Sequence, residues 1–123
     1  MPQSLGVFPA LCAGFLVAAG LSVQPAAAAD GARIFNLQCR TCHGAASTVA
    51  GPALNGVAGA RIAGRSDFAY SSALKSKGGV WTDAALDAYL AAPTRFAPGG
   101  RMITAVASPK DRAALIAHLK TLK

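Results

Sequence analysis

Two cysteines and a histidine share one short string, Cys39-Arg40-Thr41-Cys42-His43. Cysteines three positions apart on a helix lie on one face, so both thiols can add to the two vinyl groups of a single haem. The next residue, His43, is then placed to bring an imidazole nitrogen to the haem iron from the same side. The string therefore predicts covalent haem attachment, a reaction that is normally completed outside the cytoplasm.

Three other kinds of site use cysteines at this spacing. A zinc site needs four ligands, and the chain after residue 29 offers only Cys39, Cys42, His43 and His118, with no second pair of spaced cysteines. A thioredoxin-like redox pair expects strands alternating with helices, and the hydrophobic pattern shows no convincing strand. A structural disulfide explains the two cysteines but not the adjacent histidine. Haem attachment accounts for all three residues of the motif.

Haem iron has a second axial position, and Met102 is the candidate ligand. It is the only methionine after residue 29, and it follows the loop sequence Pro98-Gly99-Gly100-Arg101, where a thioether can be held toward iron. The alternative is a methionine that fills a gap in the core. His118 is the competing ligand, but it lies between apolar residues of a helical pattern and is expected to pack there.

The length and composition restrict what else the protein can be. The 123 residues leave room for one small domain, which excludes a multi-domain enzyme. Much of the apolar content is alanine, and a small domain with few large apolar side chains usually needs a metal, a disulfide or a cofactor. The chain has 12 Lys and Arg against 5 acids, all Asp, for a net charge of +7. This charge favours partners with acidic docking sites, and no nucleic acid is expected as a partner of an exported haem protein.

The first 29 residues carry no charged side chain. Their apolar run, followed by Pro25 and small residues, predicts a secretory signal peptide, with Ala27 and Ala29 in an A-x-A cleavage site. The expected domains are therefore a cleaved signal over 1–29 and a mature domain over 30–123. The alternative is an uncleaved anchor, since about 20 apolar residues in a helix cross a bilayer. No basic residue precedes the apolar run, so one usual feature of a signal peptide is missing.

The mature part shows helical patterns separated by loops. A first helix is expected from Asp30 or Gly31, with Asp30 as its N-cap, running into the cysteine motif. Residues 44–66 are rich in Gly and Ala and predict a long loop. A short helix is expected over 71–77, ended by two glycines.

Two later helices have clear start signals. Thr82 predicts an N-cap for a helix that stops before Pro93. Residues 93–107 predict a second structured loop. Ser108 then caps a last helix, with Pro109 at its first position and an apolar stripe along it.

Five strings carry a resemblance to a known family. They are GARIF before the cysteine motif, GPALNGV after it, FAYSSALKSKGGVW, LDAYLAAP and the closing DRAALIAHLKTLK. Together they make residues 31–123 closely similar to the small soluble class I cytochromes c of mitochondrial and bacterial type. The resemblance implies an all-α cytochrome c fold, with three main helices and loops wrapped around one covalently bound haem. It also implies that the first and last helices cross, with Gly31 and Phe35 on one side of the crossing and Leu115 on the other.

The resemblance assigns roles to further residues. The carbonyl of Pro52 accepts the ring N–H of His43 and orients this ligand. Tyr70 and Trp81 match residues that hydrogen-bond the haem propionates, and Tyr89 matches one near the methionine sulfur. For each of these three aromatic residues, the alternative is simple core packing.

The chain also departs from the family pattern. Ala60 stands where a propionate-binding arginine is common, and Arg61 or Arg65 is the candidate to replace it. The remaining departures are Leu74 for a frequent asparagine, Gly100 for a threonine, Thr104 for an aromatic residue at the haem edge and His118 for a tyrosine.

The expected function is that of a soluble one-electron carrier and not of an enzyme. Haem c attached through Cys39 and Cys42, with iron between His43 and Met102, leaves no open position for a substrate. The expected partners of this monomer are membrane redox complexes or periplasmic dehydrogenases with acidic docking sites, and the expected location is the periplasm. Two alternatives stay open: a membrane-tethered carrier that keeps residues 1–29, and a haem ligand sensor or peroxidase in which Met102 binds weakly.

Overall fold

The computed structural model describes residues 26–123 and positions 6, 14, 20 and 21. Most of the expected signal peptide lies outside the described residues. Five helices follow one another in the described part: α1 (Ala26–Gln38), α2 (Ser72–Lys75), α3 (Asp83–Ala91), α4 (Pro93–Phe96) and α5 (Pro109–Leu119). The described part has no strand, only an isolated antiparallel bridge between Arg61 and Val80. The expected all-α class is confirmed. No described helix has the length and apolar character needed to cross a membrane.

The first helix begins earlier than the sequence predicted. It starts at Ala26, and Asp30 lies inside it instead of capping it. The four alanines at 26–29 are the strongest helix formers available, so the helix extends back through them. Ala28 is buried, with 3% of its surface exposed. The folded helix thus includes residues upstream of the predicted cleavage site, and the prediction that Asp30 starts the fold is wrong. The domain boundary itself stays a prediction from the sequence.

The predicted caps of the two long later helices are confirmed. The hydroxyl of Thr82 accepts a hydrogen bond from the backbone N–H of Ala85 at 3.1 Å, at the start of α3. The hydroxyl of Ser108 accepts one from the N–H of Asp111 at 3.2 Å, at the start of α5. Each bond satisfies a donor that the helix itself leaves without a partner.

The two short helices differ from the prediction. The helix expected over 71–77 covers only Ser72–Lys75. Inside the stretch expected to be a loop, Pro93 starts the single turn of α4. Proline is well suited to a first helical position, because its ring presets the backbone angle and its missing N–H has no partner there in any case.

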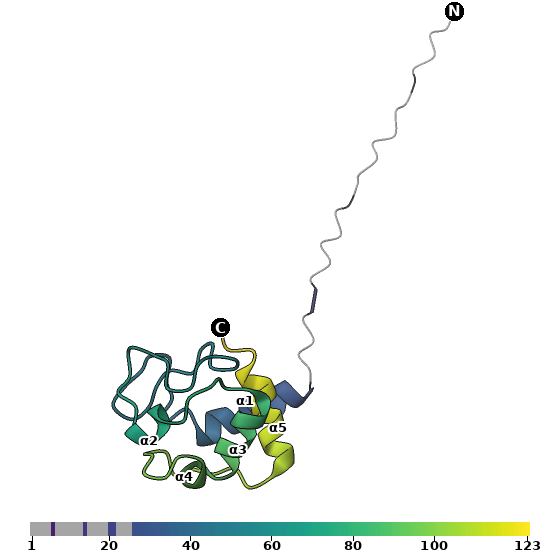
Figure 1. The fold of residues 1–123 in the computed structure, drawn as a ribbon. Coiled ribbons are helices and arrows are strands. Elements are labelled where there is room, and N and C mark those ends of the chain that lie inside the picture. Colours follow the sequence, from purple (N-terminus) through teal and green to yellow (C-terminus); the bar gives the residue numbers. More distant parts are fainter. Residues whose placement is uncertain (1–5, 7–13, 15–19, 22–25) are drawn as a thin grey trace, which may run out of the picture.

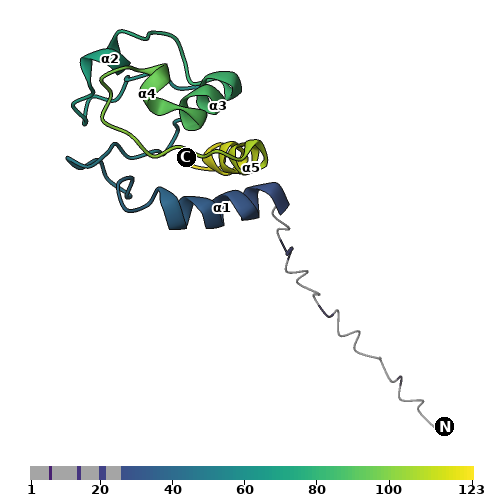
Figure 2. The ribbon, with the colours of Figure 1, turned by 90° about the horizontal axis from the view of Figure 1, so that it is seen from below.

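The first and last helices cross at close range. Figure 2 shows α1 and α5 side by side along one side of the molecule, with α2, α3 and α4 beyond α5. An ideal Cβ placed on Gly31 would lie 2.0 Å from the carbonyl oxygen of Ala114. One turn further along each helix, the rings of Phe35 and His118 lie 5.1 Å apart. The expected crossing is confirmed. On α5, however, the closest contacts with Gly31 come from Ala114 and His118, which lie on either side of the buried Leu115 in the sequence.

The core lies between α3, α5 and the loop that precedes α2. Its buried residues are Ile62, Trp81, Leu86, Leu90, Val106, Leu115, Ile116 and Leu119. Two extended segments fix the loop: Trp81 donates its backbone N–H to Ala60 at 2.8 Å, and Ile62 donates to Gly79 at 3.0 Å. Arg112 of α5 bonds Asp87 of α3 at 2.7 Å. These contacts position one side of α3 toward a cavity.

Candidate functional site

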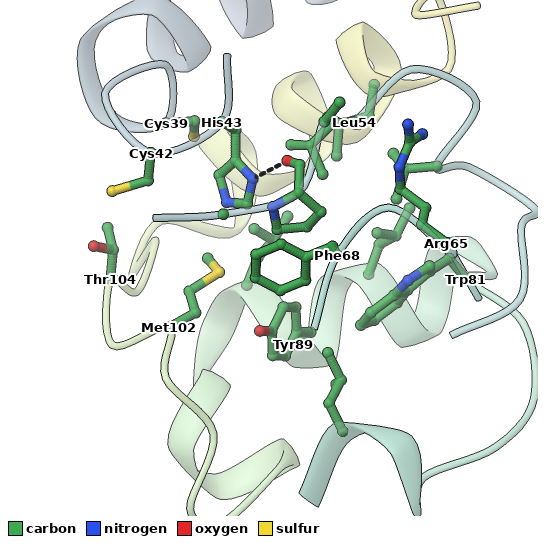
Figure 3. A pocket seen from close by; sticks show the side chains of 18 of the residues that line it. Cys39, Cys42, His43, Leu54, Arg65, Phe68, Trp81, Tyr89, Met102 and Thr104 are labelled. Atoms are coloured by element: carbon green, nitrogen blue, oxygen red, sulfur yellow. Dashed lines mark hydrogen bonds between the residues drawn. The ribbon is translucent and has the colours of Figure 1, made fainter. Parts of the chain in front are cut away.

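A cavity of about 310 Å³ lies between the end of α1, the loop after it, α3 and the segment around Met102 (Figure 3). Its lining is mostly apolar, and its volume is in the range of small-molecule and cofactor sites. All eight site residues expected from the sequence line it: Cys39, Cys42, His43, Pro52, Tyr70, Trp81, Tyr89 and Met102. His118 does not line it, and packs instead against Phe35.

The cysteine motif follows α1 directly but is not part of it. The helix ends at Gln38, and the motif continues as hydrogen-bonded turns, in which Cys42 and His43 both donate their backbone N–H to the carbonyl of Cys39, at 3.1 and 2.9 Å. The expectation of a continuous helix here is wrong, but these turns still place both cysteines and His43 along one wall of the cavity (Figure 3).

Both thiols of the motif are free, which argues against the structural disulfide. Burial raises the pKa of the Cys39 thiol, and the neighbouring Cys42 raises it further. Among the described residues, no group of three or more His, Cys, Asp or Glu side chains could hold a metal ion, so the zinc alternative has no support.

A hydrogen bond to the backbone fixes the orientation of the His43 imidazole. Its Nδ1 lies 2.8 Å from the carbonyl oxygen of Pro52, so Nδ1–H donates to that oxygen in the matching tautomer. This confirms the predicted contact and leaves Nε2 as the nitrogen able to bind a metal. Gly51 makes the close approach possible, because a Cβ there would lie 2.7 Å from the Cys42 carbonyl oxygen and 3.2 Å from the His43 ring.

Met102 faces His43 across the cavity. In Figure 3 the sulfur of Met102 and the ring of His43 point toward one another from different walls. A nitrogen and a thioether presented in this way are a known pair of axial haem ligands. Two free thiols beside the histidine, an apolar lining and the facing thioether therefore fit a covalently bound haem.

Trp81 and Tyr89 line the side of the cavity away from the cysteines, and Phe96, which does not line it, packs against both rings. Trp81 stacks on Phe96 at 5.7 Å between centroids, and Tyr89 contacts the two rings at 5.0 and 5.3 Å. Burial raises the pKa of the Tyr89 hydroxyl, which keeps it neutral. Tyr89 lines the same cavity as Met102, and its role near the methionine sulfur stays a prediction.

The hydrogen-bonded cluster of Arg65, Asp67 and Asn55 at the cavity was not predicted from the sequence. Arg65 donates from Nε and Nη2 to the two carboxylate oxygens of Asp67, both at 2.9 Å, and from Nη1 to the side chain of Asn55 at 3.1 Å. Arg61 and Arg65 both line the cavity. All three guanidinium nitrogens of Arg65 thus donate to protein groups, and the replacement of the family arginine by Arg61 or Arg65 stays a prediction. The spacing of one residue between Arg65 and Asp67 was the only sequence signal for the pair.

Comparisons with known proteins show the family of the chain. The family model for cytochrome c matches residues 28–123. Cytochrome c of Theileria parva is 44% identical over 94 residues, covering 73% of this chain and 81% of that protein. Cytochrome c2 of Rhodomicrobium vannielii is 39% identical over 95 residues, covering 74% and 75%. The solved structure of cytochrome cH from Methylobacterium extorquens has a TM-score of 0.70 and 39% identity, covering 76% of this chain and 97% of that one. The chain is a class I c-type cytochrome and belongs to the cytochrome c family.

Proposed function

We propose that this cytochrome c shuttles single electrons between redox complexes of the periplasm, with its haem iron bound by His43 and Met102. As a member of its family the protein is an electron carrier with one haem c, attached through Cys39 and Cys42. The observation that supports the ligand pair is that His43 and Met102 face one another across the cavity that the two cysteines line.

The residues around the site suit electron transfer better than catalysis. The haem supplies an iron that changes by one electron, and a thioether ligand favours its reduced form and raises its potential. His43 is held by the Pro52 carbonyl, so its ring is oriented before any metal binds. If His43 and Met102 both bound the iron, no coordination position would be left for a substrate. The apolar lining limits the access of water.

The charge of the chain supports the proposed partners. A net charge of +7 favours association with redox proteins that carry acidic docking sites, and it speeds the encounter at low salt. The proposal of a periplasmic location draws on the uncharged N-terminal stretch and on the likeness to cytochrome c2 and cytochrome cH of bacteria.

Spectroscopy of the purified haem protein tests the ligand pair. We expect a far-red sulfur-to-iron charge-transfer band in the oxidised form and no binding of CO in the reduced form. The variant Met102→Ala should lose the band, bind CO and show a lower redox potential. His118→Ala is the control, since His118 lies outside the cavity, and it should keep all three properties. A Met102→Ala variant with an unchanged oxidised spectrum would contradict the proposal.

A second candidate is a membrane-tethered carrier that retains residues 1–29. The observation in its favour is that α1 begins at Ala26 and buries Ala28, so residues before the predicted cleavage site take part in the fold. The intact mass of the protein purified from its native host separates the two. A mass equal to residues 30–123 plus one haem supports the secreted carrier, and retention of the N-terminal stretch in a membrane fraction supports the tethered one.

A further inference from the structure

A second hollow, of about 340 Å³, borders the haem cavity. Its lining residues are Arg61, Ile62, Ala63, Gly64 and Lys75, so it is lined by two cations and no acid. The N–H of Gly64 donates to the carbonyl of Arg61 at 3.1 Å and closes a turn in which Ala63 has a φ of 55°. This left-handed conformation is unusual for alanine, and it bends the chain so that four successive residues line one hollow. The fifth, Lys75, is the last residue of α2.

The positive charges of Arg61 and Lys75 have no acidic partner. Three ion pairs join described residues, and neither cation of the hollow takes part in one. These pairs engage three of the five acids of the sequence. The other two, Asp30 and Asp111, lie in α1 and α5, which stand apart from α2 in both views of the fold (Figure 1 and Figure 2). Two cations that share a hollow without an acid repel each other, and an anion bound between them would relieve this repulsion.

The types of donor indicate the class of ligand. A guanidinium presents its N–H groups in a planar fork that matches two oxygens of one phosphate group, and a lysine ammonium adds a compact point charge. The volume of the hollow is at the lower end of the range for small-molecule sites. A small anion that carries phosphate groups, such as inorganic diphosphate, suits these donors and this space.

Arg61 connects the hollow with the haem. Of the five lining residues of the hollow, only Arg61 also lines the haem cavity. An anion bound at Arg61 therefore brings negative charge close to the haem. The oxidised haem carries one positive charge more than the reduced haem, so the anion binds more tightly to the oxidised protein. Because such coupling is reciprocal, the bound anion lowers the midpoint potential by the same free energy.

We propose that Arg61 and Lys75 form a binding site for a small phosphate-bearing anion, and that occupation of this site lowers the redox potential of the haem. The site makes the potential of the carrier respond to the phosphate content of its surroundings. This inference goes beyond the proposed function. It depends on the haem c of the family, but not on which side chain binds the iron opposite His43.

Calorimetric titration of the holoprotein with inorganic diphosphate, at constant ionic strength, tests the site. We expect Lys75→Ala to weaken the binding about tenfold. Arg61→Lys, which keeps the charge but not the fork, should weaken it about threefold. Lys110→Ala is the matched control, because Lys110 is an exposed lysine of α5 that does not line the hollow. This control should change the affinity by less than about twofold.

A redox titration with and without diphosphate measures the coupling. We expect the oxidised holoprotein to bind diphosphate about threefold more tightly than the reduced form, which lowers the midpoint potential by about 28 mV, at about 59 mV for each factor of ten. Lys75→Ala should lose most of this shift at the same diphosphate concentration, and Lys110→Ala should keep it. Equal diphosphate affinities in the two variants, or no binding by wild type, would overturn the site. A midpoint potential that stays constant on binding would overturn the coupling.

The phosphate group could belong to a soluble anion or to a lipid headgroup. Vesicles of phosphatidylglycerol, compared with vesicles of phosphatidylcholine, distinguish these sources once diphosphate binding is measured. Vesicle binding that Lys75→Ala weakens and Lys110→Ala does not weaken assigns the site to a lipid phosphate. Equal vesicle binding by the two variants, together with unequal diphosphate binding, assigns it to a soluble anion.

Discussion

Gly31 of α1 and Ala114 of α5 are in backbone contact: an ideal Cβ on Gly31 would lie 2.0 Å from the carbonyl oxygen of Ala114 and 2.8 Å from the Cβ of His118. No side chain larger than hydrogen fits there unless the helices move apart. The close approach lets α1 lie flat against α5, and the buried faces of the two helices exclude water from one another.

Gly31→Ala is therefore expected to destabilise the protein. By intrinsic helix propensity alone, alanine would be favoured over glycine inside α1 by about 1 kcal/mol. The contact with a backbone oxygen, which cannot rotate away, should reverse this sign and cost about 2–4 kcal/mol in unfolding free energy. Chemical denaturation of the holoprotein measures the change. Gly44→Ala is the control, since a Cβ there would meet only one atom, at 3.9 Å. A stabilised Gly31→Ala variant would show that the helices are free to separate.

The ion pair between Arg112 and Asp87 should respond unequally to removal of its two partners. The Arg112 side chain is 12% exposed and also donates to the carbonyls of Val106 and Ala107, at 3.0 and 2.9 Å. The Asp87 side chain is 49% exposed. Arg112→Ala leaves two carbonyls without their partner and should cost about 1.5–3 kcal/mol. Asp87→Ala leaves a cation that still has both carbonyls and should cost less than about 1 kcal/mol. Thermal and denaturant unfolding of both variants tests this order, and equal losses would contradict it.

Stability in acid should depend on Asp67. The hydrogen bonds from Arg65 hold the pKa of the Asp67 carboxyl below its ordinary value of 3.8. A carboxyl whose pKa is lower in the folded protein contributes stability above the unfolded value, and this contribution is lost as the pH falls through the folded value. Asp67→Asn should thus be less stable than wild type near neutral pH, and the difference should shrink below about pH 4. Arg65→Gln removes the same pair and should flatten the profile in the same way. If the unfolding free energies of wild type and Asp67→Asn changed in parallel with pH down to pH 3, the pair of Arg65 and Asp67 would not contribute to stability.

Covalent haem attachment predicts a simple gel result. Wild type should keep its haem through a denaturing gel and through extraction with acidified organic solvent. Each of Cys39→Ala and Cys42→Ala should retain haem through the remaining thioether, in lower yield, and the double variant should lose it entirely. Cys12→Ala, which changes the cysteine before residue 29, should stain like wild type. Haem that is extracted from wild type would contradict attachment through these cysteines.

Local signals in the sequence were sufficient for several features. Thr82 and Ser108 were recognisable as caps because a hydroxyl at such a position bonds a backbone N–H only three residues away. The cysteine motif and Met102 were recognisable because their residue types are rare in this chain and suit one cofactor. The start of α1 was mispredicted because Asp30 is a good cap in isolation, whereas the preceding alanines continue the helix at no cost.

Contacts between distant loop positions could not be predicted. The contact of Arg101 with Ala69 and Phe68 depends on how two irregular segments meet, and no periodic pattern specifies that. The same holds for the engagement of Arg65 with Asn55, which lies ten positions away across an irregular loop. The resemblance to the family placed the cavity residues, but it carried no information on side chains that differ from the family pattern.

The pairing of α1 with α5 has a consequence for the kinetics of folding. The two helices lie at opposite ends of the described chain, so their contact closes a loop that contains every other helix of that part. The entropy lost on closing such a loop grows only slowly with its length. This entropy is lost before the contact between the helices contributes any stabilising free energy. Neither helix is long enough to be stable alone in water. We therefore expect the encounter of these two helices to control the rate at which the chain reaches its native topology, while the helix caps act mainly on local fraying.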